Sequence, residues 1–159
     1  MNKLEFKNLK YLFPEKTEIN NKGVLEINKN DLSDLVKKYG SPLYIYDENT
    51  IRNISKSYVN SFKSKYENIH VSYSSKAFSN PVLSKILLEE GLGIDVVSGG
   101  ELEILLRSKF PMQEVNFHGN NKSEDELIKS VKNNIGLITI DSFYELELLN
   151  KVCKKLNKN

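Results

Sequence analysis

Four polar residues with side chains suited to catalysis follow one another at intervals of roughly 20 to 23 residues: Lys76, Asp95, His118 and Asp141. A lysine that is withdrawn from water favours its neutral amine, and a neutral amine forms a Schiff base with an aldehyde or a ketone. Asp95 can orient that amine or act as its charge partner. His118 can pack near a flat cofactor or a substrate group.

Each of these residues also has a purely structural interpretation. Lys76 can extend from the end of a strand to solvent, and His118 can be a hydrogen-bonded histidine in a similar place. Asp141, followed by Ser142, is most simply part of a helix cap. Gly99 precedes a second glycine at the start of a predicted helix. Its amide can therefore receive an anion, or the glycine pair can serve close packing of helix on strand.

The spacing of these residues reflects a repeat of strand–helix units that begins near residue 70. The pattern predicts strands at 70–75, 94–97, 115–118 and 137–140, and helices at 80–90, 101–109, 123–133 and from 142 onward. Ser123 and Ser142 are each followed three residues later by glutamate, so both predict a capping box. This alternation predicts an α/β fold with a parallel sheet and right-handed crossovers.

Four such units can form a small open sheet or half of an eight-fold βα barrel, which needs about 250 residues. In each predicted strand one face is apolar, and the other is small or polar toward the C-terminal end. A doubly wound sheet needs two apolar faces, because helices cover both of them. A barrel carries its active site at the C-terminal ends of its strands. The pattern therefore favours the first four units of a (β/α)8 TIM barrel, with Lys76, Asp95 and His118 on its rim.

The region before residue 47 is more irregular. Residues 1 to about 41 are rich in asparagine and lysine, and residues 42–46 predict a short strand. A helix is predicted from Glu48 to about Tyr66, because an apolar stripe recurs there at helical spacing. Its members are Ile51, Ile54, Tyr58 and Phe62.

The composition excludes several classes of protein. The 159 residues are 39% hydrophobic and 28% charged, and 23 Lys+Arg against 21 Asp+Glu leave a net charge of +2. This balance argues against a dedicated nucleic-acid or membrane-surface binder. Neither an apolar run of membrane-spanning length nor a signal peptide is evident, so we expect a cytoplasmic protein. Cys153 has no second cysteine to pair with, and two histidines with one cysteine do not make a structural zinc site.

Five segments, in this order, resemble the N-terminal part of the diaminopimelate decarboxylases. They are Y-G-S-P-L-Y-I-Y-D (39–47), Y-S-S-K-A (73–77), G-L-G-I-D-V-V-S-G-G-E-L (91–102), F-H-G-N-N-K-S (117–123) and D-S-F (141–143). The tyrosine and Lys-Ala of the second segment alone indicate the broader alanine-racemase-like, fold-type III pyridoxal-phosphate decarboxylases. The third and fourth segments point to the diaminopimelate branch rather than to ornithine or arginine decarboxylases.

The resemblance implies a βα barrel that binds pyridoxal 5'-phosphate, with a second, β-rich domain. Residues 1–46 would contribute to the β-rich domain, and residues 47–159 would form the first half of the barrel. Lys76 matches the catalytic lysine that holds the cofactor covalently. Asp95 matches an acid beside that lysine, Glu101 an acid on the following helix, and His118 a histidine at the barrel mouth. The resemblance thus implies that all four bind the cofactor.

The implied reaction is that of a carboxy-lyase of lysine biosynthesis, which removes carbon dioxide from meso-2,6-diaminopimelate to give L-lysine. The family also implies a homodimer for the full-length form. Its members are longer and carry a glycine-rich phosphate loop, an acid for the pyridine nitrogen and a C-terminal cysteine that this sequence does not include. We therefore expect the N-terminal, Schiff-base-lysine half, inactive as a free chain. Two alternatives stay open: a non-catalytic remnant or split-protein assembly module, and a related decarboxylase of ornithine, arginine or carboxynorspermidine.

Overall fold

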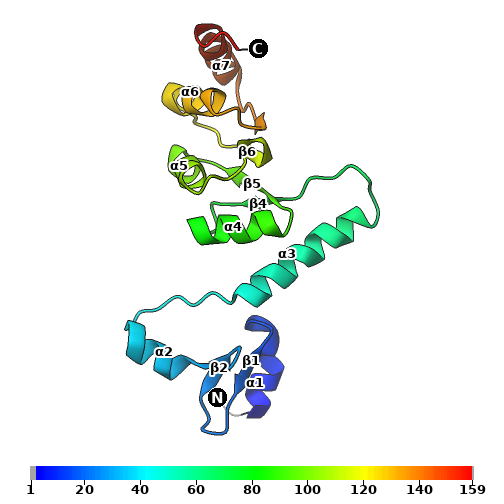
Figure 1. Ribbon diagram of the computed structural model, residues 1–159, viewed down its shortest axis with the longest axis vertical. Coiled ribbons are helices and arrows are strands. Elements are labelled where there is room, and N and C mark those ends of the chain that lie inside the picture. Colours follow the sequence, from blue (N-terminus) through cyan, green and yellow to red (C-terminus); the bar gives the residue numbers. More distant parts are fainter. Residues whose placement is uncertain (1–2, 159) are drawn as a thin grey trace. The chain divides into compact units, whose positions relative to one another are not determined.

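The computed structural model describes residues 3–158, which divide into two compact units (Figure 1). The first unit runs to Ile54, and the second runs from Ser55 onward. The boundary predicted from the sequence, between residues 46 and 47, concerns a complete two-domain protein and stays a prediction.

The first unit contains a small antiparallel sheet. Its elements are α1 (Lys3–Leu9), the 3-10 helix η1 (Lys10–Leu12), β1 (Thr17–Ile19), β2 (Leu25–Ile27), β3 (Asn30–Asp31) and α2 (Leu32–Tyr39). The strands pair in the order β1-β2-β3. Asp31 starts α2, because its carboxylate accepts a hydrogen bond from the amide of Ser33 at 2.8 Å.

The predicted strand at residues 42–46 is wrong. These residues lie in neither of the two sheets of the described chain. A strand needs a hydrogen-bonded neighbour, and Tyr44, which would have to pack in such a sheet, is 87% exposed. The aromatic and β-branched residues there satisfy the local preference for a strand, but no strand among residues 3–158 pairs with them.

The second unit carries the strand–helix repeat. After α3 (Glu48–Lys63), which begins in the first unit, come β4 (Ser72–Ser74), α4 (Pro81–Glu89), β5 (Gly93–Val96), α5 (Gly99–Arg107), the 3-10 helix η2 (Met112–Glu114), β6 (Val115–Phe117), α6 (Glu124–Lys132), β7 (Leu137–Ile138) and α7 (Phe143–Lys155). All four strands are parallel and pair in the order β4-β5-β6-β7. The predicted order of four strands and four helices is confirmed, although β4, β6 and β7 are shorter than their patterns predicted, and β5 begins one residue earlier with the predicted length.

The strand order distinguishes the two architectures that the sequence left open. A doubly wound sheet reverses its strand order, and helices then cover both faces. The order here follows the chain, so right-handed crossovers place the helices on one face. In Figure 1, α5 and α6 lie on the same side of β5 and β6. This is the arrangement that the first four units of a (β/α)8 barrel have.

The two faces of the sheet differ as the sequence predicted. Ile94 and Val96 of β5 and Val115 and Phe117 of β6 are at most 2% exposed and form the core. They pack on the side of the helices, whose buried leucines include Leu83, Leu87, Leu102, Leu105 and Leu127. The opposite, inner face carries Ser74, Asp95 and Asn116, which the register aligns in one row. The inner face can therefore bind a polar ligand.

The turn into β7 predicts a measurable steric constraint at Gly136. A Cβ atom on Gly136 would lie 2.0 Å from the backbone oxygen of Gln113. We expect Gly136→Ala to lower the free energy of unfolding by about 1–3 kcal/mol, because the backbone must move to relieve the contact. Urea unfolding followed by circular dichroism measures this change.

Gly100, near the start of α5, is the matched control. A Cβ atom there meets no other atom closer than Ser98 Oγ at 3.9 Å. Gly100→Ala should leave the stability unchanged or raise it by up to about 1 kcal/mol, because alanine favours a helix over glycine. Equal destabilisation by both substitutions would contradict the packing of the β7 turn.

Candidate active site at the strand ends

Lys76 lies in the turn that follows β4. The amide of Ala77 donates to the carbonyl of Ser74 at 3.2 Å, so Ser75 and Lys76 are the two central residues of a turn. The Lys76 side chain is exposed, and its ammonium makes no hydrogen bond or ion pair with the described residues. The expected withdrawal of this lysine from water is thus not found, because its side chain is exposed in the described chain.

Asp95 is fixed on the inner face by a neighbouring amide. The side chain of Asn116 donates from Nδ2 to Asp95 Oδ1 at 3.0 Å and lies 3.2 Å from Ser72 Oγ. This side-chain bridge joins β4, β5 and β6 across the inner face. Asp95 does not form an ion pair with Lys76, so the predicted charge partnership is not present in this structure.

His118 follows the last residue of β6 and is exposed. Its amide donates to the carbonyl of Val96 at 2.9 Å, which continues the ladder past β6. Lys76 follows the last residue of β4 by two residues, and His118 directly follows β6, which is parallel to β4 in the same sheet. The sheet therefore brings the backbones of Lys76 and His118 to one edge, and their side chains share no hydrogen bond in the described chain.

Glu101, in the first turn of α5, has both carboxylate oxygens occupied. Oε1 lies 2.6 Å from Ser75 Oγ, while Oε2 accepts from the amide of Val97 at 3.0 Å and the hydroxyl of Ser98 at 2.7 Å. The carboxylate thus links the end of β4 to the end of β5 and the start of α5. Its predicted contact with the cofactor stays a prediction.

Glutamates at the same position in α6 and α7 make similar links to the preceding unit. Each of α5, α6 and α7 starts at an N-cap serine, and the glutamate three residues later reaches back along the rim. Glu126 Oε1 accepts from the amide of Gly99 at 2.6 Å, and Glu145 Oε1 accepts from Lys122 Nζ at 2.6 Å. The sequence suggested that the Gly99 amide could bind an anion. The anion that it binds in the structure is the carboxylate of Glu126.

Lys122 and Glu145 form a buried ion pair behind the rim. Their side chains are 1% and 5% exposed. Lys122 Nζ also donates to the carbonyls of Gly119 and Thr139, each at 2.7 Å, and lies 5.7 Å from the centre of the Phe117 ring. The pair fixes the loop after His118 to the end of β7 and to α7.

The α6 capping box predicted at Ser123 is confirmed, but the one at Ser142 is only half formed. Ser142 Oγ accepts from the amide of Glu145 at 3.2 Å, as an N-cap should. The carboxylate of Glu145 instead contacts Lys122 and the amide of Asp141, the latter at 3.4 Å. A buried ammonium needs a charged partner, and Glu145 supplies it.

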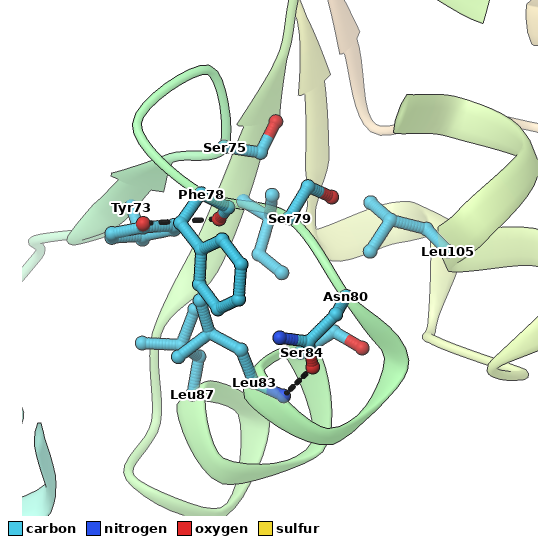
Figure 2. Close-up of a pocket in the computed structure, with 10 residues that line it drawn as sticks. Tyr73, Ser75, Phe78, Ser79, Asn80, Leu83, Ser84, Leu87 and Leu105 are labelled. Carbon is cyan, nitrogen blue, oxygen red and sulfur yellow. Dashed lines mark hydrogen bonds between the residues drawn. The ribbon is translucent and has the colours of Figure 1, made fainter. Parts of the chain in front are cut away.

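A small pocket lies on the helix side of the Lys76 turn (Figure 2). The side chains of Tyr73, Ser75, Phe78 and Leu83 line it, and Tyr73 Oη donates to the carbonyl of Phe78 at 3.1 Å. Its volume of about 10 Å³ leaves room for a single water molecule at most. The pocket is too small for a cofactor.

Comparison with known proteins identifies the family. The sequence model described as "Pyridoxal-dependent decarboxylase, pyridoxal binding domain" matches residues 51–158. The chain belongs to this family. The match includes the whole strand–helix repeat and therefore Lys76, Asp95, Glu101 and His118.

Among these decarboxylases, the chain is similar to diaminopimelate decarboxylases. It is 44% identical over 141 residues to the enzyme of Bacillus methanolicus and 46% identical over 136 residues to that of Bacillus subtilis. These alignments cover 89% and 86% of this chain, and 33% and 31% of the relatives. The diaminopimelate decarboxylase of M. jannaschii, solved in complex with L-lysine, superposes with a TM-score of 0.81 at 32% identity, over 91% of this chain and 34% of that one.

The resemblance inferred from the sequence motifs is thus confirmed, and the chain spans about a third of the length of the relatives it matches. None of the helices in the described residues is long and apolar enough to cross a membrane.

The buried ion pair predicts a large loss of stability when one partner is removed. Lys122→Met leaves the Glu145 carboxylate buried without its cation, and breaking a buried pair in this way costs about 3–5 kcal/mol. The free energy of unfolding in urea should fall by that amount. Lys85→Met makes the same replacement in an exposed pair, in which Lys85 Nζ lies 3.9 Å from Glu89 Oε1. It should change the free energy of unfolding little. A similar small effect of both substitutions would contradict the burial of Lys122.

Glu126 predicts a pH dependence of stability. Burial by itself raises the pKa of this carboxyl, but hydrogen bonds from Ser123 and Gly99 and the charge of Lys122 lower it below 4.5 on balance. A pKa lowered by folding stabilises the protein above the unfolded-state value, and this contribution is lost as the pH falls through the folded-state value.

We therefore expect the urea midpoint of Glu126→Gln to vary less than that of the wild type as the pH falls from about 7 to about 3. Asp125→Asn, which removes a charge of the same sign from the next position, should keep the wild-type dependence. A wild-type slope in Glu126→Gln would contradict the assignment.

Proposed function

We propose that this chain provides the lysine-bearing, N-terminal part of a pyridoxal-phosphate-dependent decarboxylase that converts meso-2,6-diaminopimelate to L-lysine and carbon dioxide. The observation that carries the proposal is the position of Lys76. It lies within the matched pyridoxal binding domain, in the turn at the C-terminal end of a parallel strand. Its ammonium makes no hydrogen bond or ion pair with any described residue.

The residues around Lys76 suit pyridoxal phosphate as a covalent ligand. The lysine side chain is exposed at the edge of the polar inner face, so its amine is accessible to an aldehyde. When bound, the cofactor supplies an electron-withdrawing ring that takes up the electron pair left by the departing carboxylate. The chain's own contribution is to present the amine at a fixed place on the rim.

Asp95 and His118 would complete this part of the site. Asn116 holds Asp95 through Oδ1, which leaves Oδ2 for the lysine or a ligand. The exposed imidazole of His118, which leaves the sheet at the same edge as Lys76, would lie beside a flat ring held by that lysine. The backbone pairing of Asp95 with Asn116 and the hydrogen bond from the His118 amide to Val96 support both roles.

The choice of substrate rests on the relatives. The Bacillus proteins are curated as diaminopimelate decarboxylases, and the M. jannaschii enzyme was solved with L-lysine. We infer an amino-acid substrate for the complete protein, a cytoplasmic location and a homodimer.

Labelling by the cofactor tests the proposal. A neutral Lys76 amine adds to the aldehyde carbon of pyridoxal phosphate, water leaves, and borohydride then delivers hydride to the new carbon–nitrogen double bond. We expect an absorbance band before reduction and a pyridoxyl group on Lys76 afterwards, located by peptide mass spectrometry. Lys76→Ala should lose both signals.

Lys85→Ala is the matched control, because Lys85 is an exposed lysine on the outer side of α4 and should not affect labelling. Label scattered over surface lysines, or no band at all, would contradict the proposal. That result would favour the alternative of a non-catalytic assembly module.

A further inference from the structure

The residue before Lys76 is more tightly held than Lys76 itself. Ser75 is 4% exposed, although its neighbour is exposed. Its amide donates to the carbonyl of Asp95 at 2.9 Å, and its hydroxyl lies 2.8 Å from the same carbonyl and 2.6 Å from Glu101 Oε1. A hydroxyl has one hydrogen, so these two acceptors share it.

The carboxylate of Glu101, the partner of Ser75 in this contact, is also held by other groups. Glu101 Oε2 accepts from the amide of Val97 and the hydroxyl of Ser98, so the carboxylate is attached to β5 and to the first turn of α5. Both oxygens are thus held before any ligand binds. Among residues 3–158, the carboxylate is linked to the turn after β4 by its hydrogen bond with Ser75 alone.

The contact between Ser75 and Glu101 also restrains the backbone of Lys76. Ser75 and Lys76 are the two central residues of the turn closed by Ala77 and Ser74, so anchoring Ser75 fixes the backbone from which the lysine side chain extends. The tip of that side chain has no partner among residues 3–158. A lysine with a fixed backbone and a free amine is suited to meet a small aldehyde in one orientation.

We propose that Glu101 is a positioning residue for Lys76 and acts through Ser75, independently of any contact with the cofactor. This inference rests on the proposed function only for the identity of the aldehyde. The anchoring itself is a property of the folded chain.

Hydrogen exchange tests the anchor without a cofactor. Ser75→Ala removes the hydroxyl contact, and the amide of Ala77, whose partner is Ser74 in the Lys76 turn, should exchange about tenfold faster, the effect of losing roughly one hydrogen bond. Ser98→Ala is the matched control, because the amide of Val97 still holds the same carboxylate oxygen when the Ser98 hydroxyl is removed, and Ser98 does not belong to the β4 turn. It should lower the melting temperature without changing the exchange of Ala77.

Labelling tests the consequence. In single-turnover reductive labelling with pyridoxal phosphate, Ser75→Ala and Glu101→Ala should each slow the modification of Lys76 about tenfold. The double variant should be no slower than either single one, since both act through one contact. Ser98→Ala should label Lys76 at the wild-type rate, and Lys85 should react equally in all variants.

The outcomes separate the two proposals. A wild-type chain that labels Lys76 selectively, with an unchanged rate in Ser75→Ala, overturns the positioning role alone. A wild-type chain without selective labelling overturns the proposed function, and the exchange of Ala77 then decides about the anchor. Unchanged Ala77 exchange in Ser75→Ala, or equal effects of Ser75→Ala and Ser98→Ala, overturns the anchor.

Discussion

The parallel register of β4, β5 and β6 is the constraint on which the candidate site depends. Because Ser74, Asp95 and Asn116 are paired in one row, the residues that follow each strand emerge at the same edge. Lys76 follows the residue pair that begins with Ser74, the register partner of Asp95, so Lys76 and Asp95 come to the same end of the sheet only for this reason. A slip of one residue would exchange the inner and outer faces of a strand. It would place Asp95 among the helices, where a carboxylate without a partner is costly, so the apolar core and the polar site specify the same register.

The rim carries three glutamates that serve the fold in the same way. Glu101, Glu126 and Glu145 each follow an N-cap serine by three residues, and each binds a group of the preceding strand–helix unit. A carboxylate in the first turn of a helix is favoured by the helix dipole, and a link to the preceding unit adds a contact that an isolated helix could not make. An acidic residue at a βα rim is therefore weak evidence of catalysis by itself. Lys76 differs from these carboxylates because its charged group has no internal partner in the described residues.

Local patterns in the sequence predicted most of the fold and part of the site. Alternating strand faces and helix caps are properties of neighbouring residues, so the four units and the Ser123 capping box could be read directly. The strand at residues 42–46 failed because a strand depends on a partner that its own sequence does not contain. The ion pair of Lys122 with Glu145 was missed for a related reason. Both residues fit local motifs, and only the packing of the loop after β6 against α7 shows that they meet.

Asp95 and Glu101 have different roles at the rim because their carboxylates have different hydrogen-bond partners. Asp95 has one oxygen held by Asn116, and Glu101 has both oxygens held, so of the two acids only Asp95 keeps a free acceptor on the inner face. The motifs alone could not separate them, because both lie in the one segment of residues 91–102, and the difference appears only in the hydrogen bonds that each side chain makes. An acid with a free oxygen can respond to a ligand, whereas an acid with two occupied oxygens can affect the chemistry only by holding something else in place. Glu101 holds the backbone of Lys76 in place through its hydrogen bond with Ser75.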